Sequence, residues 1–252
     1  MTLPRTANRE EWLTARLDLL AEEKQLTRAR DRLNEQRRRL PMVEIEKSYV
    51  FEGSTGPATL LDMFEGRRQL IIQHFMFDPE WQEGCPTCSC DADSLGHLAH
   101  LHARDTTFAA VSRAPWSTIK PFKTRMGWTF PWYSSHASDF NYDFRVTLDR
   151  NIGQIEYNYR TLNDVEAGSI EMPGVSVFFR DGQRVFHTYS TYGRGTDLHN
   201  TAYLYLDLTP LGRQEGWGGT PDLGGEGQNW VQHHDRYPPP TPSIDNRLGE
   251  QH

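Results

Sequence analysis

The sequence has few cysteines and no long apolar segment, and each absence narrows the class of protein. Only three of the 252 residues are cysteine. A zinc site built on a Cys-X-X-Cys pair needs a second pair of Cys or His ligands elsewhere in the chain, and no cysteine lies outside the short segment that holds all three. No stretch approaches the roughly eighteen apolar residues that cross a bilayer. Residues 1 to 6 lead into charged residues and not into the apolar core of a signal peptide. We therefore expect no membrane contact.

An excess of positive charge is also missing. Lys and Arg total 27 against 34 Asp and Glu, a formal net charge of −7. Proteins that neutralise phosphates need the opposite balance, so a nucleic-acid partner is not expected. We expect a cytoplasmic protein, in which thiols stay reduced and a cysteine cluster serves catalysis or metal binding. The length suits one domain with a full hydrophobic core and appendages.

All three cysteines lie in one short segment, residues 84 to 90, with the sequence Gly-Cys-Pro-Thr-Cys-Ser-Cys. The preceding residues 70 to 77 are β-branched and aromatic, which is typical of a buried strand. Residues 91 to 102 have apolar positions at helical spacing, so Cys85 and Cys88 are predicted at a helix N-terminus. Backbone N–H groups and the helix dipole stabilise a thiolate there. A strand, a Cys-X-X-Cys turn and a helix form the redox-active unit of a thioredoxin-like fold.

A long amphipathic helix is predicted in the segment 1 to 41. Asn8 followed by Glu11 three residues later indicates its start, and Pro41 ends it. Its apolar residues recur every seven positions, although the positions between them are too polar for a full coiled coil. We expect this helix to pack on the domain or on a partner subunit, the latter giving a homodimer through the helix. A non-catalytic interaction module that uses this helix is a further interpretation. The apolar stripe consists of Trp12, Leu19, Leu26, Leu33 and Leu40.

One domain is expected over residues 42 to 212, with an insertion around residues 135 to 170. Alternating strands and helices around buried runs favour an α/β sandwich. Near the end of this domain, Asp181 and Gly182 predict the turn of a β-hairpin. Residues 213 to 252 are rich in Gly and Pro, which predicts an irregular tail. Strands are predicted at 43–51, 70–77, 108–112 and 130–134, the last near a sheet edge, and helices at 58–64, 91–102, 115–126 and 198–206.

Several longer motifs resemble a known family. Cys85-Pro86-Thr87-Cys88 after a core strand, with Met172-Pro173-Gly174-Val175 leading into the hairpin, resembles the dithiol and cis-proline of thioredoxin-like proteins. Residues 108 to 134 resemble the peroxiredoxin-like branch of that superfamily. More specifically, over about residues 8 to 213 the chain resembles the bacterial domain-of-unknown-function family 899. The runs that carry this resemblance lie at residues 112–115, 125–128, 139–143 and 187–192.

The resemblance implies a thioredoxin-like sandwich with a central mixed sheet and a thiol-disulfide oxidoreductase that needs no cofactor. Cys85 would attack a disulfide of a protein or a small molecule, and Cys88 would resolve the mixed disulfide. The bond between Met172 and Pro173 would be cis, with its backbone against an extended substrate. Trp81, earlier in the cysteine loop, is a further candidate for substrate binding.

This chain departs from the superfamily pattern at two positions. Gly84 stands where thioredoxins carry a tryptophan before the first cysteine. Gln82 stands where a peroxiredoxin has Thr or Ser three residues before its reactive cysteine. The pattern therefore favours disulfide exchange over a dedicated peroxidase.

A copper site is the alternative interpretation of the same cysteines. Three soft thiolates close together suit Cu(I), and imidazole suits copper as well. The ligands would be Cys85, Cys88, Cys90 and His187, whose position resembles the active face of related copper chaperones. Cys90 separates the two interpretations, because the dithiol reaction does not need it and the copper site does.

Overall fold

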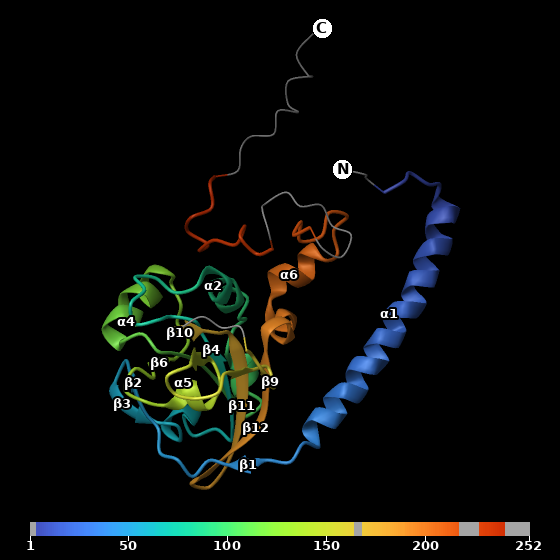
Figure 1. Ribbon diagram of the computed structural model, residues 1–252. Coiled ribbons are helices and arrows are strands. Elements are labelled where there is room, and N and C mark those ends of the chain that lie inside the picture. The colour runs from blue at the N-terminus through green and yellow to red at the C-terminus, as the bar shows by residue number, and fades with distance from the viewer. Residues whose placement is uncertain (1–3, 164–167, 217–226, 240–252) are drawn as a thin grey trace.

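The computed structural model describes residues 4–163, 168–216 and 227–239 of the chain. Its centre is a curved mixed sheet of eight strands, with helices on both faces (Figure 1). In sheet order the strands are β1 (Val43–Glu44), β12 (Arg184–Tyr192), β11 (Gly174–Asp181), β4 (Gln69–His74), β5 (Thr106–Ser112), β6 (Trp132–Ser134), β2 (Val50–Gly53) and β3 (Gly56–Thr59).

The strand order confirms the predicted thioredoxin-like sandwich. β4 and β5 are parallel and adjacent, and the chain passes between them through the helix that carries the cysteines. β11 pairs antiparallel with the other side of β4, and the β11–β12 hairpin completes the four-strand core. Both residues of the predicted Asp-Gly turn lie where this hairpin turns, and Gly182 has a φ of 60°, as such turns require.

Two hydrophobic clusters cover the two faces of the sheet. One contains Phe75, Cys88 and Phe122 and lies under α2 and α4. The other contains Phe64 and Phe140 and lies under η1 and α5. β5 is buried along its whole length because it lies between these clusters. The helices are α1 (Arg9–Arg38), α2 (Pro86–Asp93), α3 (Ala99–His102), α4 (Trp116–Arg125), α5 (Phe140–Asp143), α6 (Thr201–Leu206) and the 3₁₀ turns η1 (Asp62–Phe64) and η2 (Gly193–His199).

Some predicted elements differ in extent. The strand predicted at 43–51 is two strands, because Val43 pairs with β12 whereas Val50 pairs with β3. The helix predicted at 91–102 is divided, since α2 starts earlier and ends at Asp93. The segment predicted to be helical at 58–64 begins in β3 and holds only the η1 turn. β6 is not an edge strand, because it pairs with β5 on one side and β2 on the other.

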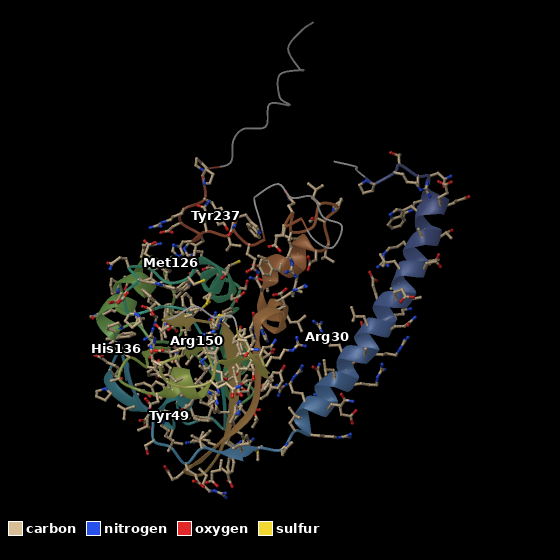
Figure 2. All side chains as sticks on the ribbon, viewed as in Figure 1. Arg30, Tyr49, Met126, His136, Arg150 and Tyr237 are labelled. Atoms are coloured by element: carbon tan, nitrogen blue, oxygen red, sulfur yellow. The ribbon has the colours of Figure 1, made fainter. Side chains whose placement is uncertain are left out.

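The N-terminal helix α1 begins where the sequence predicts. Asn8 caps it, and Glu11 completes a capping box with Asn8. At its C-terminal end α1 contacts the domain, where the Arg37 guanidinium lies 4.7 Å from the centroid of the Tyr189 ring. No residue of α1 is buried, so the prediction that it packs on its own domain is wrong for most of its length. The helix precedes β1, which is a strand at the edge of the sheet, and it extends beyond this strand as an arm (Figure 1). Figure 2 shows the side chains along this arm, Arg30 among them.

The expected insertion and tail both reach the end of the sheet that carries the cysteines. The insertion contains β7 (Thr147–Asp149), which pairs with β10 (Ser169–Glu171), and a hairpin of β8 (Glu156–Tyr157) and β9 (Arg160–Thr161). The described parts of the tail, 213–216 and 227–239, form no helix or extended strand, as predicted, but Arg213, Glu215, Val231 and His233 are buried. Residues 217–226 and 240–252 of the predicted tail lie outside the described residues. None of the described helices is long and apolar enough to cross a membrane.

Candidate active site

The first two cysteines lie at the N-terminus of α2, as the sequence predicts. Cys85 is the N-cap residue, Pro86 takes the first helical position, and Cys88 follows one turn later. Proline suits that first position because it has no N–H to leave unpaired and its φ is already helical. Cys88 is only 2% exposed, whereas Cys85 is partly exposed. The helix start therefore presents one accessible thiol and one buried thiol.

The surroundings of Cys85 favour its thiolate. A hydrogen bond from the Cys88 thiol lowers the pKa of Cys85 to about 6, helped by the Thr87 hydroxyl and by the backbone N–H groups of both residues, although burial acts in the opposite direction. The Thr87 Oγ1 atom lies 3.0 Å from the Cys85 sulfur. At pH 7, Cys85 is therefore mostly ionised.

Cys88 has the opposite character. Its hydrogen bond to the Cys85 thiolate and its burial raise the pKa of Cys88 well above the ordinary value. The N–H of Met76 donates to the Cys88 sulfur at 3.5 Å, and the Gln73 amide donates to the Cys88 carbonyl at 3.2 Å. β4 and the residues that follow it thus hold the buried thiol in place.

Gly84 has a steric reason to be glycine. A Cβ there would lie 2.5 Å from Cε1 of Phe75 and 2.9 Å from Cε1 of Phe122. These rings leave no room for the tryptophan that thioredoxins have at this position. The Gly84 carbonyl is in turn hydrogen-bonded to Nε2 of His233 at 2.8 Å. The tail therefore helps to hold the cysteine loop, and composition alone did not indicate His233 as part of the site.

Cys90 points to a different group of residues. The side-chain N–H of Asn200 donates to the Cys90 sulfur at 3.3 Å and to Asp91 at 2.8 Å. Burial raises the pKa of Asp91 to about 7. The sequence indicated neither Asp91 nor Asn200, because the first is one of many acidic residues and the second lies 110 residues beyond Cys90.

Pro173 lies beside Cys88 in the walls of two cavities, but the bond between Met172 and Pro173 is not cis. The described chain has no cis peptide bond, so that prediction is wrong. The backbone runs from β10 into β11 with the Met172 N–H donating to the Val146 carbonyl at 2.8 Å. A trans bond fits this backbone path from β10 to β11, and the trans form of a bond before proline is favoured by about 0.5–1 kcal/mol. Pro173 still lines the cavities that reach Cys88.

Two cavities meet at Cys88. One has a volume of about 300 Å³ and is lined by residues of α2, η2 and the start of the tail. The other has a volume of about 240 Å³ and lies between α2, α3 and the strands β4, β5 and β11. Cys88, Asp91, Pro173 and Thr196 line both. Small molecules can thus approach the buried thiol from two sides.

Two other predicted site residues lie apart from these cavities. Trp81 is 40% exposed in the turn after β4, and its N–H donates to the Asp78 carbonyl. His187 lies on β12, where its Nε2 is hydrogen-bonded to Ser190 at 2.7 Å. Neither lines a cavity with Cys88. Their assignment to substrate binding and to copper, respectively, stays a prediction.

The copper alternative requires several ligands to converge. Across residues 4–163, 168–216 and 227–239, no three Cys, His, Asp or Glu side chains come together in a way that could hold an ion. Cys90 faces Asn200, whereas Cys88 faces Met76. The donor set predicted for copper does not form one site in this arrangement.

Residues 1–237 match the family described as bacterial protein of unknown function (DUF899). No curated protein matches the chain.

The chain is similar to several solved structures at low identity. A mutant of peroxiredoxin Q from Xanthomonas campestris has 15% identity and a TM-score of 0.41, covering 62% of this chain and 90% of that one. Peroxidoxin BcpB from Mycobacterium tuberculosis has 12% identity and a TM-score of 0.45, covering 65% and 92%. AhpC from Enterococcus faecalis has 13% identity and a TM-score of 0.41, covering 66% and 93%.

Proposed function

Because the chain belongs to the DUF899 family of bacterial proteins, whose description names no reaction, we propose from the site itself that it is a thiol-disulfide oxidoreductase. Cys85 is the attacking thiol and Cys88 is the resolving thiol. One observation carries the proposal. Hydrogen bonding lowers the pKa of the accessible Cys85 to about 6, while the pKa of its buried neighbour Cys88 is raised. Adjacent thiols with opposite shifts are suited to attack followed by resolution.

The reaction transfers two electrons from the dithiol to a disulfide. The Cys85 thiolate attacks one substrate sulfur, forms a mixed disulfide, and releases the other half of the substrate as a thiolate. The hydrogen bond to the Cys85 thiolate, which is the largest cause of the high pKa of Cys88, is then lost. Cys88 therefore gives up its proton more readily and attacks the Cys85 sulfur, releasing the second half of the substrate. The products are a Cys85–Cys88 disulfide and two thiols.

A valine in place of Thr87 tests the origin of the low pKa. Thr87→Val keeps the shape of the side chain but removes the hydroxyl next to the Cys85 sulfur. Hydrogen bonds to charged groups contribute about 1.5–3 kcal/mol, so the midpoint of Cys85 alkylation should rise by about one pH unit from its wild-type value near pH 6. The measurement is the rate of iodoacetamide labelling between pH 4 and pH 9, with the labelled residue identified by mass spectrometry.

The same samples test the proposed reaction directly. Reduced wild-type protein mixed with oxidised glutathione should acquire a Cys85–Cys88 disulfide and release two molecules of reduced glutathione, and peptide mapping detects the protein disulfide. Labelling that reaches Cys90 before Cys85, or a disulfide that includes Cys90 in place of Cys88, would refute the assigned roles. A midpoint that does not move in Thr87→Val would show that the hydroxyl does not stabilise the thiolate.

A further inference from the structure

We propose that the substrate is a small amphipathic disulfide, with a charged head and an apolar group, and not an extended protein segment. This inference rests on the proposed function and names its substrate class. Two features carry it: the backbone beside the dithiol has its hydrogen-bonding groups occupied, and the two cavities at Cys88 differ in character.

The backbone at Met172 and Pro173 is engaged inside the protein. The Met172 N–H donates to the Val146 carbonyl at 2.8 Å. The Tyr157 hydroxyl donates to the Pro173 carbonyl at 2.7 Å and accepts from the Gly193 N–H at 2.8 Å. An extended peptide would have to pair with such backbone groups to add itself as a strand. Tyr157, which belongs to the insertion, therefore occupies the Pro173 carbonyl with which such a peptide would pair.

The larger cavity is lined by charges of both signs. Arg194 and Arg213 lie in its wall together with Asp197 and Glu215. Arg213 is 8% exposed and forms ion pairs with Asp197 at 2.9 Å and with Asp207 at 2.8 Å. Glu215 is 5% exposed and accepts a hydrogen bond from the Trp230 indole at 2.9 Å, so these paired charges act in partly desolvated surroundings. A wall with both signs complements a head group that carries both an ammonium and a carboxylate, as an amino acid does.

The smaller cavity is mainly apolar. Most of its wall is aliphatic and aromatic. Its polar lining consists of Asp91 and Thr196, which it shares with the larger cavity, and of Gln73, His74, Ser94 and His199. An alkyl group of a few carbons can bury its surface there, which is the main source of affinity in such pockets. The apolar side chains that line it are Ile71, Leu95, Leu101, Phe108 and Val175.

The two cavities meet at the resolving thiol, where Cys88, Asp91 and Pro173 line both. A disulfide with the head in one cavity and the alkyl group in the other would therefore have its sulfur atoms next to Cys88. Cys85 lines neither cavity, but its sulfur lies 3.0 Å from the hydroxyl of Thr87, which lines the larger one. The electrons and atoms balance as in the proposed reaction. One disulfide and the protein dithiol give two small thiols and the Cys85–Cys88 disulfide, and an added dithiol reductant regenerates the protein.

A panel of disulfides tests this substrate class. The probe is the mixed disulfide of cysteine and butanethiol, mixed with pre-reduced protein in a stopped-flow instrument. We expect its rate constant to exceed by tenfold or more those of hydroxyethyl disulfide, which lacks both groups, and of an extended peptide with one disulfide. The corresponding probe made from N-acetylcysteine methyl ester, which has no charges, should lose most of that advantage.

Filling the apolar cavity should remove the preference. Gly96 lines this cavity, has no heavy atom within 4 Å of a built Cβ, and has no positive φ that would strain a side chain. Gly96→Phe should slow the butanethiol probe by about tenfold, the order of effect produced by one well-packed methylene. Gly96→Leu fills the cavity less and should give a smaller loss. Gly153, which is exposed and equally unobstructed, gives the matched control Gly153→Phe, whose rates should equal those of the wild type.

The outcomes separate this inference from the proposed function. Exchange with the peptide as fast as with the butanethiol probe, or an unchanged probe rate in Gly96→Phe, would overturn the substrate class and leave the dithiol reaction standing. No exchange with any disulfide in the wild type would refute the proposed function itself. Circular dichroism of the Gly96 variants confirms that a lost rate does not reflect unfolding.

A second inference concerns α1, and it rests on different observations. We infer that α1 pairs antiparallel with the α1 of a second copy. The helix has no buried residue, and Leu26 near its middle is 72% exposed. Within the helix the apolar stripe is symmetric about that leucine, so an antiparallel pair places Leu19 against Leu33 and brings Trp12 beside the residues that follow the end of α1 at Arg38. A two-fold axis through Leu26 requires this reciprocal arrangement.

Charge supports the antiparallel direction. Between Arg9 and Glu23 the helix has five acidic and two basic residues, whereas between Lys24 and Arg38 it has six basic and two acidic residues. Antiparallel pairing puts the acidic half of each copy beside the basic half of the other. Parallel pairing would place like charges together, which is unfavourable along a helix pair.

Leu26→Glu should dissociate the pair, because it places two carboxylates at the two-fold axis. The readout is mass by light scattering during gel filtration at micromolar concentration. Ala21→Glu adds the same charge two positions after Leu19, turned about 200° from the stripe, and should leave the dimer intact. A benzoylphenylalanine at Leu19 should crosslink to the peptide that contains Leu33. A monomeric wild type, or a crosslink from position 19 to its own counterpart, would overturn the inference.

Discussion

Replacing Cys85 with serine is expected to abolish disulfide exchange, with a loss of about three orders of magnitude or more, the scale on which removal of an activated nucleophile acts. A serine hydroxyl is not ionised at pH 7, whereas the surroundings of Cys85 lower its pKa to about 6. The rate of the wild type should fall as the pH falls through 6, because the thiolate becomes protonated. The measurement is disulfide reduction with dithiothreitol as the regenerating reductant.

The other two cysteines serve as controls with distinct outcomes. Cys88→Ser should still attack but should accumulate the mixed disulfide on Cys85, which mass spectrometry detects as an adduct. Cys90→Ser should keep most of the rate, since Cys90 contacts Asn200 and not the Cys85 sulfur. Two results together would refute the dithiol reaction in favour of a metal site. The wild type would bind near-stoichiometric copper, and Cys90→Ser would lose both the copper and the activity.

Arg113→Met should give the largest loss of stability, about 3–5 kcal/mol, which is typical when one partner of a buried ion pair is removed. The Arg113 Nε donates to Glu171 at 2.6 Å, and the guanidinium also donates to Asp78. The side chain of Glu171 is 1% exposed. Without the arginine, its charge is buried with only Thr147 as a hydrogen-bond partner. The loss is measured by urea unfolding.

The size of this loss should depend on pH. Burial raises the pKa of Glu171, and Arg113 opposes that rise. In the variant the folded-state pKa of Glu171 therefore lies further above the unfolded value of about 4.3, so the folded protein binds the proton more tightly. The loss should be smallest below that unfolded value and should grow as the pH rises through the folded value.

A matched variant distinguishes burial from ion pairing in general. Arg68 donates to Asp105 at 2.6 Å, but the two side chains are 69% and 40% exposed. Arg68→Met should change the stability far less than Arg113→Met, because water already solvates both charges. Equal losses in the two variants, or a loss for Arg113→Met that does not vary with pH, would contradict the account of Glu171.

Local sequence was sufficient where neighbouring residues determine the structure. The capping box at Asn8, the buried strand before the cysteines and the Asp-Gly hairpin were all predictable, because caps, alternation and turns depend on residues a few positions apart. The place of Cys85 at the start of α2 follows from the same short-range rules. The trans bond at Pro173 was not predictable in this way, since it depends on the path between β10 and β11.

The sequence by itself determined the fold class, the dithiol at a helix N-terminus and the heptad stripe of α1, because each depends on residue spacing within one element. Only the tertiary structure decided which residues surround the dithiol. His233 reaches Gly84 from the tail, and Tyr157 reaches Pro173 from the insertion. The structure also decided that α1 contacts its domain at its C-terminal end, through Arg37 and Tyr189, while none of its residues is buried. Such contacts join segments far apart in the chain, and the free energy that selects them comes from packing the whole domain, which no local pattern records.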